Sequence, residues 1–283
     1  MMKISCNPVV VVAACLSFAI GSPRVSAADF SDTALAYRYG SNFTEPARPQ
    51  DIGKNILTLS HVNSGKSGLH ALSLEGRYSD RDDPARNSTE GATEYLFNYR
   101  YQLAAASVLD QPLAFGPVGD MALMAGIDLT TKDTLFAPRK RAWVFGPVLK
   151  FDVPGFLDLA LLHYKERNHK GIPGTPHPDH SFEGTWMVNA MWGIPFRLGA
   201  TSAVFNGMFN RLGEKGKDFN DIPSVGETLL RINMMVDLGQ TFGLGKKTLM
   251  AGVGYEWWKN KYGTPAGIGT HTRTPTLHVE THF

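Results

Sequence analysis

The 283-residue chain contains very little cysteine. Its two cysteines, Cys6 and Cys15, both lie within the first 27 residues, and the rest of the sequence has none. Beyond residue 27 the sequence therefore excludes disulfide bonds, thiol catalysis and cysteine metal sites. Stability in that part of the chain has to come from burial or from a closed, hydrogen-bonded architecture.

An excess of charge of either sign is also lacking. Lys and Arg total 28 and Asp and Glu total 26, and the first 27 residues contribute two basic residues, Lys3 and Arg24, but no acid. A nucleic-acid-binding protein needs a basic face to neutralise phosphates, so the balance argues against that class. The mean hydropathy is −0.16. No later apolar run reaches about 18 residues, which argues against a helical membrane protein.

The first 27 residues have the pattern of a secretory signal peptide. Lys3 supplies the positive charge, residues 9–20 supply the apolar segment, and residues 25–27 provide small side chains for cleavage. The apolar segment is too short for a transmembrane anchor and lacks a stop-transfer flank. Lipid attachment at Cys15 is disfavoured because apolar residues continue past it. We expect residues 28–283 to form the exported protein.

Alternation of apolar and polar residues with a period of two runs through the remaining sequence. In residues 93–103, for example, aromatic side chains such as Tyr95 alternate with polar ones such as Glu94 and Arg100. Clusters of Gly, Pro, Asn and Asp end such segments. The pattern predicts half-buried β-strands, because successive side chains of a strand point to opposite faces.

Twelve such segments are predicted as strands. They span residues 32–40, 54–62, 69–79, 92–103, 118–130, 141–152, 156–166, 181–192, 197–209, 227–239, 247–259 and 272–283. Twelve gives about 21 residues for each strand with its connection, which suits membrane strands of roughly 9–11 residues better than eight or sixteen strands would.

The predicted connections alternate between long and short. The long ones are 41–53, 80–91, 131–140, 167–180, 210–226 and 260–271, and the short ones are 63–68, 153–155, 193–196 and 240–246. Long external loops and short periplasmic turns are typical of outer-membrane barrels. Residues 104–117 break the rule, either as a periplasmic elaboration or as an error in the strand count. We predict an all-β fold, a 12-stranded antiparallel transmembrane β-barrel of the bacterial outer membrane, with a soluble exported β-sandwich as the alternative.

The C-terminal end alternates up to a terminal aromatic residue, Phe283. This ending is similar to the C-terminal signal of outer-membrane barrels, so we expect it to be read by the barrel-assembly machinery. The expected location is the outer membrane of a Gram-negative bacterium, in contact with lipid and lipopolysaccharide. Arg139-Lys140-Arg141 ends a predicted external loop, where it either meets lipopolysaccharide phosphates or forms an ordinary solvated tip.

Residues near the start of the predicted barrel resemble those of a known family. The resemblance is carried by Tyr37-Arg38-Tyr39-Gly40-Ser41-Asn42-Phe43-Thr44-Glu45-Pro46, by Asp51-Ile52-Gly53-Lys54-Asn55-Ile56 and by His61. These residues resemble the nucleoside-specific channel-forming outer-membrane proteins, the Tsx-like family. The motif similarity covers residues 33–78, and beyond it the resemblance rests on length, strand number and the terminal aromatic. It implies a monomeric barrel with a narrow lumen that passes nucleosides by diffusion, lined by aromatic and ionisable side chains at Tyr37, Tyr39, Phe43 and Lys54.

The alternation itself predicts which other side chains line the lumen. Barrels of eight strands are filled by their own side chains and barrels of sixteen to eighteen leave an open channel, so twelve implies a constricted pore. The lumen candidates lie opposite the apolar faces: Glu75, Arg77, Glu94, Asn98, Arg100, Arg231, Asn233, Asp237 and Glu256, together with His278 and Glu280. A lining of both signs with nearby aromatics suits a neutral, hydrogen-bonding ring solute. The alternative is that these charges pair with one another across a plugged lumen.

The predicted function is passive, moderately selective diffusion of small solutes, with nucleosides as the leading class. No cofactor or metal is expected: the histidines at 169, 177, 180, 278 and 282 lack an evident second shell and are interpreted as polar loop and lumen residues. Two alternatives remain, a structural or adhesion barrel without transport and a phospholipase-like barrel enzyme using His61 and Ser64. Strand alternation places His61 and Ser64 on opposite faces, which disfavours the enzyme.

Overall fold

A computed structural model describes residues 30–65 and 68–283 of the chain. The predicted signal peptide, residues 1–27, and both cysteines lie outside the described residues. Within the part that the structure describes, no helix is long and apolar enough to cross a membrane.

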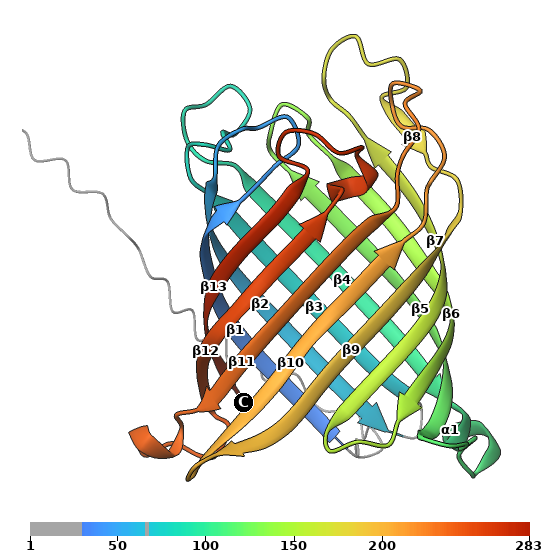
Figure 1. Ribbon diagram of the computed structural model, residues 1–283, viewed down its shortest axis with the longest axis vertical. Helices are drawn as coiled ribbons and strands as arrows, with labels where there is room; N and C mark the ends of the chain where they lie inside the picture. The colour runs from blue at the N-terminus through green and yellow to red at the C-terminus, as the bar shows by residue number, and fades with distance from the viewer. Residues whose placement is uncertain (1–29, 66–67) are drawn as a thin grey trace, which may run out of the picture.

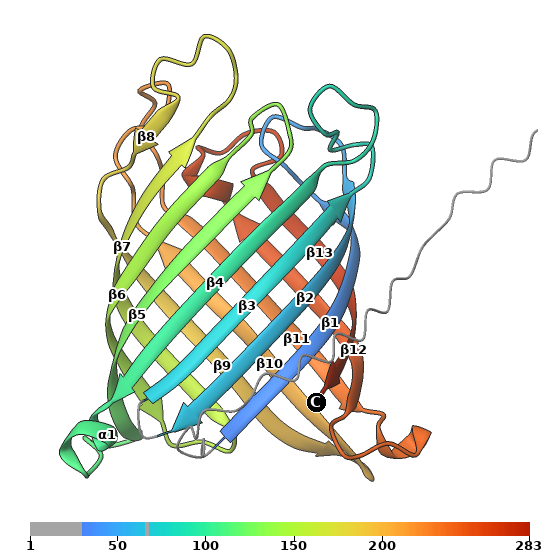
Figure 2. The same cartoon turned by 180° about the vertical axis from the view of Figure 1, so that it is seen from behind.

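Twelve long strands form a closed antiparallel barrel (Figures 1 and 2). They are β1 (Phe30–Phe43), β2 (Ile52–Gly65), β3 (Gly68–Ser79), β4 (Thr93–Ala104), β5 (Val118–Lys132), β6 (Arg139–Phe151), β7 (Phe156–His169), β9 (Thr185–Leu198), β10 (Thr201–Leu212), β11 (Glu227–Asp237), β12 (Leu249–Lys259) and β13 (His271–His282). Each strand pairs with its neighbours in the chain, apart from a short extra strand, and β1 pairs with β13 to close the circle. The predicted twelve-stranded barrel is therefore confirmed. Closure leaves no long strand with an unpaired edge, which a β-structure in lipid requires.

The long connections gather at one end of the barrel (Figure 1). That end also holds β8 (Asp179–Ser181), which pairs with β7, and η2 (Lys261–Gly263). The opposite end holds α1 (Ala105–Leu109) and η1 (Gln240–Phe242). Residues 105–117 thus form an elaboration at the short-turn end, and they do not disturb the strand count, because β4 and β5 are direct neighbours.

One predicted turn is wrong. Residues 193–196 belong to β9, and the chain reverses only after Leu198, where Gly199 has a φ of 61°. Pairing of β9 with β7 ends at Gly193, whereas pairing with β10 continues, so that Pro195 opposes Val204. Proline is tolerated there because this end of β9 has a partner on one side only. The predicted turn before β7 is correct, and Gly155 takes its positive φ of 83°.

The two faces of the barrel wall have opposite character. The outer face exposes large apolar side chains such as Leu35, Tyr95, Trp143 and Leu277. Charged and amide side chains alternate with them and turn inward, where most are buried. The period-two pattern of the sequence is therefore the physical origin of an apolar outside and a polar inside.

Candidate functional site

On β1, Arg38 identifies the face of the strand that points into the barrel. Arg38 is 7% exposed, whereas Tyr37 and Tyr39 on either side of it are 40% and 38% exposed on the outer face. The expectation that both tyrosines line the lumen is wrong, because a strand cannot turn an arginine and its two neighbours the same way. The Tyr37 hydroxyl instead donates to Asn55 Oδ1 at 2.6 Å on the outside of the barrel.

Phe43 and Lys54 do lie inside, near the end with the long loops. Phe43 packs with Ile52 and Ile56 in a small buried cluster. The ammonium group of Lys54 lies 5.8 Å from the centre of the Phe43 ring and 2.6 Å from Glu45 Oε1. Phe43 is packed against apolar side chains and Lys54 is ion-paired, so the two residues hold β1 and β2 together at the loop end of the barrel.

The remaining predicted lumen residues all occupy inward positions of the strand register. Asp237 has a local structural contact instead: its carboxylate accepts hydrogen bonds from the backbone N–H groups of Gly239 and Lys247 in the turn that follows β11. Arg100 forms a separate ion pair with Asp128 at 2.7 Å. The inward set from the prediction is Glu75, Arg77, Glu94, Asn98, Arg100, Arg231, Asn233, Asp237 and Glu256, with His278 and Glu280.

Four of the inward side chains form a closed ring of ion pairs. Glu256 of β12 lies 2.7 Å from Arg231 of β11 and 3.0 Å from Arg38 of β1. Glu75 of β3 lies 3.6 Å from Arg38 and 4.0 Å from Arg231. We call Arg38, Glu75, Arg231 and Glu256 the charged bridge. Arg77 extends it, because it pairs with Glu75 and, at 3.3 Å, with Glu94 of β4.

The charged bridge crosses the interior of the barrel. Four strands, β2, β1, β13 and β12, separate β3 from β11 in the sheet, so a contact between Glu75 and Arg231 cannot run along the wall. Wall residues of the enclosed strands are covered: Thr274 of β13 is 0% exposed and Ile56 of β2 is 1% exposed. The charged bridge therefore fills the interior beside these strands at its own level.

Arg38 was not among the predicted site residues, although it is central to the charged bridge. Its Nη1 donates to Glu256, while its Nη2 is buried without a hydrogen-bond partner among the described residues. The signal was present in the sequence: Tyr37, Arg38 and Tyr39 alternate, and an arginine is costly on a lipid-facing surface. Combined with the strand alternation, that cost favours the arginine on the inside and the tyrosines on the outside.

The wall opposite the charged bridge combines apolar and amide side chains. Inward residues of β5, β6, β7 and β9, among them Met124, Val148, Leu162 and Met187, form a buried apolar cluster. Met191 also occupies an inward position, level in register with Asp158 and Met208, yet it is 38% exposed. Space therefore remains open beside it. This apolar stretch was not predicted, because the alternation was used to assign only the polar faces of the strands to the lumen.

Amide pairs border the same wall. Asn233 of β11 donates to Asn206 of β10 at 2.8 Å, and Asn189 of β9 donates to Asn210 at 2.7 Å. An amide bonded on one side keeps further donors and acceptors for a passing solute. The interior thus offers charge on one side and apolar and amide groups on the other.

A second charged cluster lies among the long loops. Glu45, between β1 and β2, contacts Lys54 at 2.6 Å, Lys132 at 3.4 Å and Lys261 at 3.4 Å. Burial opposes the charge of Glu45, but the three lysines outweigh it and hold the pKa of its carboxyl well below the usual range. Burial lowers the pKa of Lys261 to about 8 despite the attraction of Glu45. Burial also raises the pKa of Tyr262, with Glu45 adding to the effect.

The histidines have local partners. His169 contacts Asp179 at 2.9 Å, His177 contacts Asp221 at 3.3 Å, and His282 contacts Asp32 at 2.9 Å. Among residues 30–65 and 68–283, no group of three or more His, Cys, Asp or Glu side chains is arranged to hold a metal ion. On β2, the His61 ring contacts Thr33 Oγ1 at 2.8 Å on the outer face. Ser64 lies on the opposite face of the same strand.

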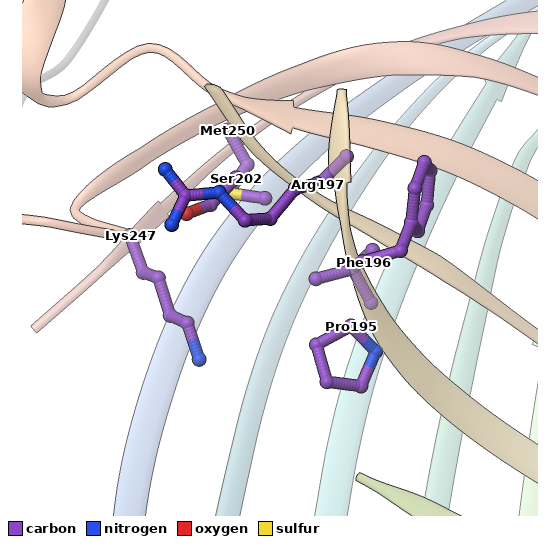
Figure 3. A pocket seen from close by; sticks show the side chains of 8 residues that line it. Pro195, Phe196, Arg197, Ser202, Lys247 and Met250 are labelled. Carbon is purple, nitrogen blue, oxygen red and sulfur yellow. The ribbon is translucent and has the colours of Figure 1, made fainter. Parts of the chain in front are cut away.

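A shallow hollow lies at the short-turn end, under the β9–β10 hairpin. Arg197, Ser202 and Lys247 lie on one side of it and Pro195 on the other (Figure 3). Its position at the barrel rim keeps it separate from the charged bridge.

Comparison with known proteins gives similarity of architecture only. No family model and no curated protein matches the chain. Among solved structures, the translocator domain of the autotransporter NalP from Neisseria meningitidis is similar with a TM-score of 0.47 and 11% identity, covering 92% of this chain and 90% of that one. The KdgM porin in complex with disordered oligogalacturonate gives 0.43 and 12%, over 88% and 99% of the two chains. The NanC porin gives 0.45 and 9%, over 89% and 99%. At this level the similarities assign no function.

Proposed function

We propose that the chain is an outer-membrane channel for passive, moderately selective diffusion of small solutes, with nucleosides as the leading class. The observation that carries the proposal is the closed barrel, with an apolar outer face and a polar interior that the charged bridge crosses. The charged bridge narrows the passage, and open space beside Met191 remains on the other side.

The chemistry of this passage supports a neutral solute with one apolar face and polar edges. Along the charged bridge, two arginines alternate with two carboxylates, so the bridge has no net charge. The wall opposite presents Met191 and the asparagine pairs. A nucleoside has a flat base that contacts apolar groups and edges that accept and donate hydrogen bonds. Weak contacts of this kind let a solute leave as readily as it enters.

The resemblance to the nucleoside channels in residues 33–78 agrees with this solute class. Of the aromatic lumen positions that it implied, Tyr37 and Tyr39 face outward and Phe43 is buried, so we assign contact with the base to the wall around Met191. We further propose that the protein is a monomer in the outer membrane of a Gram-negative bacterium, acts without a cofactor, and is assembled through recognition of Phe283.

A liposome-swelling experiment tests the proposal. Liposomes containing the refolded mature barrel are exposed to isotonic adenosine, thymidine or glucose, with empty liposomes as the control. Faster swelling in both nucleosides than in glucose supports selective passage. Equal swelling rates for all three solutes would indicate a general porin and contradict the proposed selectivity. No swelling at all would contradict the proposal that the protein is a channel.

A further inference from the structure

The strands β5, β6 and β7 run side by side (Figure 2). Near the long loops, residues of these strands line a groove on the outer face of the barrel. Its volume is about 350 Å³. Ile127, Leu129 and Trp143 line it with exposed apolar surface, and Arg141, Lys165 and Arg167 add three cationic groups. The groove therefore combines an apolar floor with a basic rim.

The cationic groups face one another across two strands. Arg141 of β6 is the direct cross-strand partner of Arg167 of β7, and Lys165 is paired in the same way with Trp143. Like charges directly opposite each other destabilise a sheet. In the described part of the chain, no carboxylate forms an ion pair with Arg141, Lys165 or Arg167. The nearest basic neighbour, Arg139, reaches only Asp179, at 3.9 Å. Asp179 attracts Arg167 as well as Arg139 but forms no ion pair with Arg167, so the described residues relieve the repulsion between Arg141 and Arg167 only in part.

These residues are not a solvated loop tip, as one interpretation of the sequence had it. β6 begins at Arg139, so the basic run is split by strand alternation. Arg141 points outward with Trp143, whereas Lys140 points inward and lies 5.7 Å from the centre of the Tyr164 ring. The outward cations are thus fixed on rigid strands directly beside apolar side chains that the barrel presents to lipid.

We propose that this groove binds a phosphorylated lipid of the outer leaflet, with a phosphate between Arg141 and Arg167 and an acyl chain along Ile127, Leu129 and Trp143. Phosphate accepts paired hydrogen bonds from guanidinium groups and neutralises two cations at once. A soluble anion would neutralise the rim but would leave the apolar floor uncovered. This site lies outside the lumen and is independent of the proposed channel function.

Equilibrium binding by native mass spectrometry tests the proposal on the refolded full barrel in detergent. The probes are bis-phosphorylated lipid A, the same lipid without phosphates, and inorganic phosphate. The test variant is Arg141→Gln/Arg167→Gln, and the matched control is Arg273→Gln, an exposed arginine on β13 whose cross-strand partner is Trp257 rather than a cation. Heat-modifiable migration in gels confirms folding of each variant, which we expect because the substitutions remove a repulsion.

Binding of lipid A should be about 30-fold weaker in the double variant, since each basic group beside an anionic lipid contributes about fivefold. The wild type should bind dephosphorylated lipid A as weakly as the double variant binds lipid A, and Arg273→Gln should match the wild type. Unchanged affinity in the double variant, or equal binding of the dephosphorylated lipid, would overturn the site. Inorganic phosphate binding as tightly as lipid A would overturn the assignment to a lipid.

Discussion

Glu45 is a single buried carboxylate held among Lys54, Lys132 and Lys261 at the loop end of the barrel. Lys54 and Lys132 also approach Asp83, at 3.9 and 2.7 Å. Lys261 donates to the backbone oxygen of Thr44 at 2.5 Å. One cluster of charges thus connects three loops to the barrel wall. The attraction and repulsion within it, together with burial, determine which lysine loses its proton most easily.

Lys261 is the group whose protonation changes near neutral pH. Its pKa is about 8 in the folded barrel, against an unfolded value of 10.5. Between these values the unfolded chain binds one more proton, so the free energy of unfolding should increase as pH rises from about 8 to 10.5, by up to about 3 kcal/mol.

Denaturant unfolding at several pH values checks this prediction. The Lys261→Met variant should lack the increase, while the control Lys246→Met, which removes an exposed lysine, should retain it. An equal increase in Lys261→Met and the wild type would show that the buried lysine is not its source.

Two predictions for individual residues are wrong. Tyr37 and Tyr39 were assigned to the lumen through a family resemblance, whereas the alternation around Arg38 gives the opposite orientation. Phe43 and Lys54, taken from the same resemblance, do lie inside. Where the alternation alone was used, as for Glu75, Arg77 and Arg231, the inward assignment agrees with the structure.

At the scale of elements, the charged bridge links strands on opposite sides of the lumen. Its arginines and carboxylates balance, so removal of one sign leaves the other uncompensated. Glu75→Gln should shift the channel towards chloride, and Arg231→Gln should shift it towards potassium. We expect about a fivefold change in the permeability ratio, because a unit charge 4 Å from an ion in water contributes about 1 kcal/mol.

Reversal potentials in a potassium chloride gradient measure these shifts. The double variant should return to weak selectivity, and Arg273→Gln, which removes a charge from the outer face, should behave as the wild type. Shifts of the same sign in Glu75→Gln and Arg231→Gln would show that the charged bridge does not border the ion path.

The existence of the strands and the face that each side chain takes could be predicted from the sequence, because both follow from the period-two pattern. The end of β9 could not, since Gly193 and Pro195 signal a turn locally, while the missing partner on one side of β9 is a property of the assembled sheet. Pairing of the inward charges across the lumen was one of the two alternatives that the sequence left open, but the specific pair of Glu75 and Arg231 could not be predicted. It depends on barrel closure, which brings together residues far apart in sequence.

At the scale of the whole molecule, the barrel places each type of side chain in the environment that suits it. Closure pairs the long strands with their neighbours, and the end of β9 is the one-sided stretch noted above. The outer face presents apolar groups to lipid, with one basic groove near the loops. The charged bridge crosses the interior between β3 and β11, and Met191 on the opposite wall keeps space beside it.

Single-channel conductance of the refolded barrel in a planar bilayer tests this account most directly. Adenosine, thymidine and a hexose are titrated onto one open channel. The account predicts a small, steady conductance that both nucleosides block in a saturable way and that the hexose leaves unchanged. A correctly folded barrel with no conductance at all would contradict it.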